Sequence, residues 1–154
     1  MKLKFKIYFN LELFFKRNKL EPKTTFIKMK DIQTQEEIYI VVDEFYKKLL
    51  ADNKISYIFT DVVKIKLEEH LPILVTFWSQ AILGTGGYVN NLTQIHLDIN
   101  TSSSLSKELL DLCLNHFEAA IEENFEGINC ERMKNQAHNL STIMQIKIAQ
   151  QKEK

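Results

Sequence analysis

The chain has 154 residues and no net formal charge, because 20 basic residues balance 20 acidic ones. This neutrality argues against a nucleic-acid-binding protein, and 45% hydrophobic with 26% charged residues is the composition of a globular domain rather than a disordered or fibrous chain. The length favours a single domain, and only four Gly and two Pro favour long helices over a turn-rich β sandwich.

The charges are distributed unevenly along the chain. Residues 1–30 contain nine basic and two acidic side chains, a sum of +7, so residues 31–154 carry −7. Basic and apolar residues alternate over positions 2–7, which is typical of a β-strand, but a lone strand has no partner with which to pair. We therefore expect residues 1–30 to be a separate basic extension and residues 31–154 to form the domain.

Three interpretations of residues 1–30 stay open: a poorly ordered extension, a basic amphipathic anchor that contacts a membrane surface, or an upstream stretch included by the choice of start codon. We favour the first and third over membrane contact. The segment lacks the continuous apolar region and the small-residue cleavage site of a secretory signal, and no apolar run approaches the roughly 20 residues of a transmembrane helix. The expected location is the cytoplasm.

Helical periodicity begins after residue 31 and predicts a first helix that ends at Asp52-Asn53. Its apolar stripe consists of Ile38, Val41, Val42, Phe45, Leu49 and Leu50. A short segment, 55–59, leads to a second predicted helix over about residues 62–83, followed by Gly84, a residue type common after a helix C-terminus. The apolar face of this second helix contains Leu67, Leu71, Leu74, Phe77, Trp78, Ala81 and Ile82.

Residues 84–103 are predicted to form a loose loop with only short helical potential around residues 92–97. The polar run at residues 100–104 is suited to capping a third helix, over about residues 105–125. A fourth helix is predicted after Gly127, over about residues 129–150. The sequence thus predicts an all-α domain, and a loop of about twenty residues inside such a domain usually has a function.

Few side chains could carry out chemistry in an apolar setting. The two cysteines, Cys113 and Cys130, match no disulfide scaffold or zinc motif, so we interpret them as buried reduced thiols. No nucleophile–His–acid arrangement with a local signature is found. The glycines at positions 84, 86 and 87 follow a helix rather than a strand, so they do not form a dinucleotide-binding loop.

The histidines are the remaining candidates. His70 lies on the apolar and aromatic face of the second predicted helix, so it is either a satisfied boundary residue or a group aimed into a cavity. His96 lies between two apolar residues in the predicted loop, and singly neither histidine indicates a site. His116 and His138 have polar neighbours, and we interpret them as surface or boundary residues.

Together these residues form a pattern that resembles the group III truncated haemoglobins over roughly residues 32–150. The pattern consists, in chain order, of Phe45-Tyr46, Ile58-Phe59, His70, Phe77-Trp78, Leu83-Gly84-x-Gly86-x-Tyr88 and His96-Leu97-Asp98. The most specific parts are the block from His70 to Tyr88 and the histidine eighteen residues after Trp78. A helical bundle unrelated to this family would rarely contain all of them in this order and spacing.

The resemblance implies a globin-like, two-over-two α-helical sandwich that encloses haem b. It implies that His96 is the proximal iron ligand and that residues 84–103 form the proximal wall of a pocket. Phe59 would pack against the porphyrin face. The other residues implied to contact the cofactor are His70, Leu74, Phe77, Trp78, Tyr88 and Cys113.

On the distal side, the resemblance implies that Tyr46 donates a hydrogen bond to O₂, an interaction worth roughly 1.5–3 kcal/mol. A buried tyrosine with its hydroxyl at the core boundary is the alternative. His70 matches the distal histidine, which could donate a second hydrogen bond, gate the pocket or bind the sixth position of the iron.

Two residues depart from the family pattern. Pro72 disfavours helical geometry at Leu71, so we expect the helix to start or kink there. Cys113 occupies the position at which the family commonly has Trp, which implies a roomier pocket that holds oxygen less tightly, with Tyr46 as the principal donor. A redox-sensitive or iron-ligating Cys113 thiol is the alternative.

The function that the resemblance implies is reversible binding of O₂, CO or NO. NO dioxygenation or a peroxidase-like reaction, served by an unidentified reductase, stays open because the same polar donors can polarise an O–O bond. A hypothesis from a different class is a cofactor-free helical interaction module, in which the histidines are incidental and the aromatic residues are core.

Overall fold

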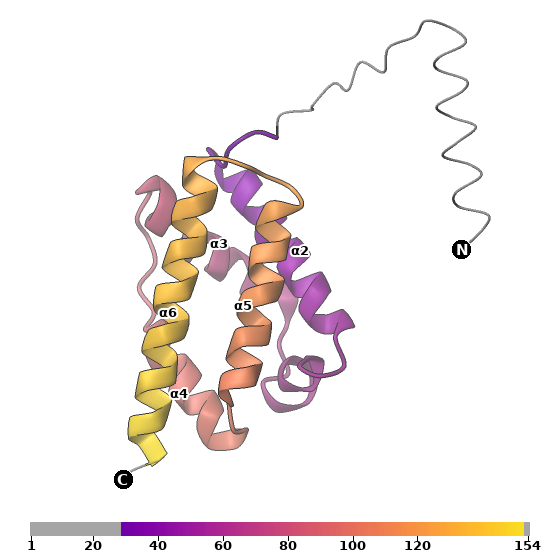
Figure 1. Cartoon of the computed structure of the whole chain (residues 1–154), viewed down its shortest axis with the longest axis vertical. Helices are drawn as coiled ribbons and strands as arrows, with labels where there is room; N and C mark the ends of the chain where they lie inside the picture. Colours follow the sequence, from indigo (N-terminus) through magenta and orange to yellow (C-terminus); the bar gives the residue numbers. More distant parts are fainter. Residues whose placement is uncertain (1–28, 153–154) are drawn as a thin grey trace, which may run out of the picture.

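The computed structural model of the chain describes residues 29–152, so the expected N-terminal extension, residues 1–30, lies almost wholly outside the described part (Figure 1). Residues 29–152 contain helices and no strand. No helix in this part is long and apolar enough to cross a membrane. The elements are α2 (Gln35–Ala51), a short π-helical turn η1 (Ile58–Val62), α3 (Leu67–Leu83), α4 (Leu92–Ser102), α5 (Lys107–Glu122) and α6 (Ile128–Lys152).

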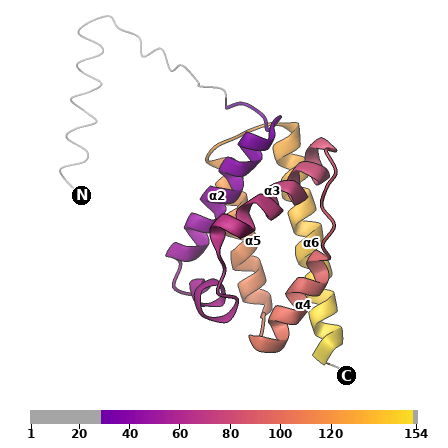
Figure 2. The ribbon, with the colours of Figure 1, turned by 180° about the vertical axis from the view of Figure 1, so that it is seen from behind.

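Helices α2, α3, α5 and α6 form the body of the molecule. Helix α2 packs against both α3 and α5, and α5 in turn packs against α6 (Figures 1 and 2). Helix α6 also contacts α3 and the shorter α4, which lies beside its C-terminal half. The prediction of an all-α, two-over-two arrangement is confirmed.

Helix α2 ends where the sequence predicts and begins at Gln35, a few residues after the point from which helical periodicity was expected. The Thr34 side chain accepts a hydrogen bond from the backbone N–H of Glu37 at 3.3 Å, and the Glu37 carboxylate accepts from the backbone N–H of Thr34 at 3.0 Å. This capping box satisfies two N–H groups at the helix start. At the other end Asp52 is the C-cap residue. The apolar stripe between them is almost entirely buried.

The second predicted helix was placed five residues too early. Residues 58–62 form the separate turn η1, and α3 begins at Leu67 rather than at 62 or at Pro72. Pro72 lies inside the helix, where it cannot donate to the carbonyl of Glu68. Glu68 is exposed, so water can bond that carbonyl instead. The helix ends at Gly84, which has the left-handed φ of 72° expected of a residue after a C-terminus.

The prediction of a loose loop over residues 84–103 is wrong for its second half. Residues 92–102 form α4, whose first turn is capped by the Asn91 side chain, which accepts from the backbone N–H of Gln94 at 3.1 Å. The polar residues 100–102 therefore end α4. Ser106 caps α5 instead, accepting from the backbone N–H of Leu109 at 3.3 Å.

Candidate functional site

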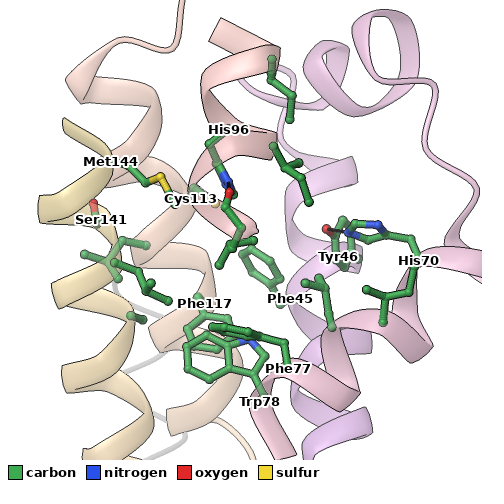
Figure 3. Close-up of a pocket in the computed structure, with 18 of the residues that line it drawn as sticks. Phe45, Tyr46, His70, Phe77, Trp78, His96, Cys113, Phe117, Ser141 and Met144 are labelled. Carbon is green, nitrogen blue, oxygen red and sulfur yellow. Dashed lines mark hydrogen bonds between the residues drawn. The ribbon is translucent and has the colours of Figure 1, made fainter. Parts of the chain in front are cut away.

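A cavity of about 220 Å³ lies among α2, η1, α3, α4, α5 and α6 (Figure 3). It is partly open to solvent, and Val63, Ile73 and Ile95 line it while remaining about 40% exposed, so they rim its mouth. The nine site residues expected from the sequence all line this one cavity: Tyr46, Phe59, His70, Leu74, Phe77, Trp78, Tyr88, His96 and Cys113. The structure therefore brings together side chains that come from five separate elements and one loop.

The sequence missed the contribution of α6 to the cavity. Ala137, Leu140, Ser141 and Met144 line it, together with Phe117 of α5. Four of these are apolar residues of the third and fourth predicted helices, and their helical spacing is typical of residues that face the interior. Periodicity does not distinguish a residue that faces a packed core from one that faces a cavity, and the polar Ser141 gave no signal.

Aromatic side chains form one side of the cavity. The indole of Trp78 stacks on the ring of Phe117, with centroids 4.7 Å apart and an angle of 21° between the planes. Phe117 also meets Phe45 edge to face at 5.2 Å, and Phe77 meets Tyr88 in the same manner at 4.9 Å. Since Phe45, Trp78 and Phe117 are all more than nine-tenths buried, this wall is fixed by packing between α2, α3 and α5.

Tyr46 and His70 form a hydrogen-bonded pair at the cavity. The Tyr46 hydroxyl lies 2.8 Å from Nε2 of His70, and the two rings meet edge to face. Burial raises the pKa of Tyr46. Burial also lowers the pKa of His70, with a smaller contribution from His96. Both side chains are therefore neutral near pH 7, and each can donate or accept a hydrogen bond.

His96 extends into the cavity from α4, whereas the Tyr46–His70 pair reaches it from α2 and α3 (Figure 3). Its Nδ1 lies 2.9 Å from the backbone carbonyl oxygen of Leu92, one turn earlier in the helix. A carbonyl only accepts, so Nδ1 carries the proton and donates, and Nε2 keeps its lone pair. Burial lowers the pKa of His96, an effect that outweighs the opposing influence of this hydrogen bond, so the imidazole is neutral.

The two cysteines are free, and they lie in different places. Cys113 lines the cavity, and burial raises the pKa of its thiol to about 12. Cys130 is buried at the start of α6, where its thiol lies 3.4 Å from the carboxylate of Asp31. With a pKa of about 12, the Cys113 thiol is almost entirely protonated at neutral pH and is a poor nucleophile.

The other two histidines do not line the cavity. Nε2 of His116 lies 2.8 Å from the Asp52 carboxylate, and Nε2 of His138 lies 2.6 Å from that of Glu118. Both side chains are partly exposed, at 23% and 55%. These positions agree with their interpretation as boundary and surface residues.

The residues present fit a haem. The lining is almost entirely hydrocarbon, which suits the apolar faces of a porphyrin. Among residues 29–152 no group of three or more His, Cys, Asp or Glu side chains could hold a free metal ion. Haem iron needs only one axial imidazole from the protein, because the porphyrin supplies four nitrogen ligands. His96 presents such an imidazole, with its tautomer fixed by the Leu92 carbonyl.

Comparisons with known proteins bear on the fold. No protein-family model matches the sequence, and no curated protein sequence matches it. Among solved structures, the chain is similar to a group III truncated haemoglobin from Campylobacter jejuni, with a TM-score of 0.70 and 22% sequence identity. The match covers 78% of this chain and 95% of that one. The chain therefore has the fold of a group III truncated haemoglobin, as the sequence pattern predicts.

Proposed function

We propose that this chain is a haem-binding globin that binds small gas molecules such as O₂, CO or NO. The observation that carries the proposal is His96, a neutral imidazole whose Nδ1 donates to a carbonyl while its Nε2 remains free to ligate iron in an apolar cavity. When bound, the haem would supply an iron centre to which a diatomic ligand can add. The fold of a truncated haemoglobin supports the same function.

In this proposal each wall of the cavity has a separate task. His96 holds the iron from the α4 side, and Phe59, Leu74, Phe77, Trp78 and Tyr88 exclude water from the porphyrin faces. The exposed rim at Val63, Ile73 and Ile95 would let a polar edge of the cofactor reach solvent. Tyr46 and His70 line the same cavity from α2 and α3, so they would be the residues that contact a gas ligand, and His70 would be the second candidate to bind the iron.

The hydrogen bond between Tyr46 and His70 determines which proton is available to the ligand. If the neutral imidazole of His70 carries its proton on Nε2, it donates to the Tyr46 oxygen, and the phenolic O–H is free to donate into the cavity. Donation from His70 also polarises the phenol and makes it a stronger donor. The opposite tautomer would use the phenolic proton within the pair. We propose the first arrangement for the ligand-bound protein.

The small size of Cys113 is part of the proposal. A thiol in place of a large indole leaves more room in the cavity. It stays protonated, and its S–H group is a weaker donor than an indole N–H or a phenol O–H. Tyr46 would then be the principal donor to the gas. The proposal also includes NO dioxygenation or peroxidase-like chemistry, for which a reductase would donate the electrons. It includes a cytoplasmic location, which the two free thiols support.

Haem uptake by the full chain tests the proposal. We expect the purified protein to bind haemin stoichiometrically, with a strong Soret absorption band and CO- and O₂-dependent shifts after reduction. His96→Gly should abolish stable haem binding, and added imidazole should restore the band. His138→Gly is the matched control, because that histidine is exposed and outside the cavity.

Two outcomes would contradict the proposal. A folded protein that takes up no haem would instead support the cofactor-free interaction module. A His96→Gly variant that retains haem with the affinity and spectrum of the unaltered chain would assign the iron to another residue, with His70 the first to examine.

A further inference from the structure

Helix α4 has an unusual place in this fold because none of its residues is fully buried, although several are partly buried. Leu92, Ile95, His96 and Ile99 line the cavity, and Leu97 and Ile99, both partly buried, are the residues of α4 that pack against the hydrophobic core. Helix α4 packs on α6, beside its C-terminal half (Figures 1 and 2). Further contacts are therefore needed to hold α4, and with it His96, in place relative to the rest of the molecule.

Two hydrogen bonds connect the C-terminal ends of α4 and α6, and a third holds the α4 residue Asn100 to the segment that precedes α5. The Asn100 side chain accepts from the backbone N–H of Leu105 at 2.8 Å, and it donates to Oε1 of Gln151 at 2.9 Å. Nε2 of Gln151 then donates to the backbone carbonyl of Leu97 at 3.5 Å. Gln151 thus holds α4 at a side chain and at a backbone group one turn apart.

The chemistry of the groups fixes the direction of every bond in this set. The backbone N–H of Leu105 can only donate, so the oxygen of the Asn100 amide must face it and its nitrogen must face Gln151. Gln151 therefore presents its oxygen to Asn100 and its nitrogen to the Leu97 carbonyl, which can only accept. No alternative arrangement of the two amides satisfies all the groups.

We propose that Gln151 is a positioning residue for the proximal histidine. Leu97 directly follows His96 in α4, so a bond to the Leu97 carbonyl restrains the helix at the residue next to the imidazole. Gln151 thus links α6, which lines the cavity through Ser141 and Met144, to α4, the helix that carries His96. This inference rests on the proposed function, because it assigns His96 to the iron.

The test compares Gln151→Ala with Gln150→Ala in the full chain. Gln150 is the exposed neighbour on the same helix, so its variant controls for loss of a glutamine near the end of α6. In Gln151→Ala we expect amide hydrogen exchange across α4 to accelerate about two- to tenfold and transfer of haem to an acceptor globin to accelerate by a similar factor, because net hydrogen bonds of this kind have that effect on an equilibrium. The iron–histidine stretching band in the resonance Raman spectrum should shift or broaden, whereas the urea midpoint of the whole chain should change little.

Two further variants locate the effect. Gln151→Glu keeps an acceptor for Asn100 and loses the donor to Leu97, so its behaviour should lie between those of the unaltered chain and Gln151→Ala. Asn100→Asp keeps the acceptor for Leu105 and loses the donor to Gln151, and combining it with Gln151→Ala should add little to the single effects.

The inference is wrong if Gln151→Ala equals Gln150→Ala in α4 exchange, haem transfer and the Raman band. A drop in the urea midpoint with an unchanged Raman band would likewise overturn it, since that result describes a purely structural residue. If the unaltered chain takes up no haem, the proposed function fails. The hydrogen-exchange comparison does not need haem and still tests Gln151: accelerated exchange in α4 of Gln151→Ala shows that Gln151 holds the helix, and unchanged exchange shows that it does not.

Discussion

The two walls of the cavity are held in different ways. On the α2 side, seven residues of the helix are buried, and the rings of Phe45, Phe117 and Trp78 pack on one another. On the α4 side no residue is fully buried, and the helix is held by the partial packing of Leu97 and Ile99 and by the amide hydrogen bonds to Gln151. The wall that presents Tyr46 and His70 is therefore held mainly by packing in the core, with the hydrogen bond between these two residues added to it. The wall that presents His96 relies on contacts that a cofactor would complete.

The largest expected effect is a loss of stability when the wall on the α2 side, the packed wall, is changed. Phe117→Ala removes the ring that contacts both Phe45 and Trp78, and we expect it to lower the free energy of unfolding by about 3–5 kcal/mol. Ile95→Ala in α4 should lower it by less than about 1 kcal/mol, because Ile95 is 41% exposed. Urea unfolding of the haem-free chain measures both. Equal losses from the two variants would show that the walls do not differ.

The next effect concerns ligand binding at the packed wall. Tyr46→Phe removes the donor from the Tyr46–His70 pair while keeping the ring, so we expect O₂ dissociation from the haem-loaded protein to accelerate about tenfold. Flash photolysis and rapid mixing measure the rate. Tyr88→Phe is the control, because its ring also lines the cavity but lies against Phe77, away from this pair. An unchanged rate in Tyr46→Phe would remove Tyr46 from the gas site.

The smallest effect is a dependence of stability on pH that both walls share. Burial lowers the pKa of His70 and of His96, so below about pH 6.5 the unfolded chain binds more protons than the folded one. The stability of the haem-free chain should therefore fall as the pH drops below about 6.5 and should be restored on return to neutral pH. Urea midpoints at several pH values measure this change.

Substitutions of the two histidines separate the contributions of the two walls to the pH dependence of stability. Replacing His70 or His96 by Gln should each flatten part of the dependence, and replacing both should flatten most of it. His138→Gln is the control, because this histidine lies outside the cavity and is mostly exposed. A dependence that persists in the double variant would have to come from other groups.

The sequence predicted the packed wall better than the α4 wall, for a physical reason. Buried residues of α2 recur at helical spacing, so their positions and the end of the helix at Asp52 could be predicted. In α4, by contrast, three apolar residues face a cavity, and the polar residues 100–102 resembled a cap. The start of α3 was misplaced because the helix was expected from residue 62, whereas residue 62 ends the turn η1 and residues 63–66 form a non-helical connection that still contains apolar residues.

The gathering of these residues at one cavity was predictable through the family pattern rather than through any single residue. His70 and His96 gave no signal alone, yet both line the cavity together with every other residue of the pattern that was assigned to the site. What could not be predicted is the contact between Asn100 and Gln151. These residues are 51 positions apart, and a pair of amides leaves no periodic trace in the sequence.

The stack of Trp78 on Phe117 has a practical consequence for following the protein in solution. Trp78 is the single tryptophan of the chain, and it lies on the cavity wall. Its emission therefore comes from one known place, beside the space that a strongly absorbing porphyrin would fill. Energy transfer to such a chromophore would extinguish the fluorescence, so filling and emptying of the cavity could be followed in real time without attaching a label.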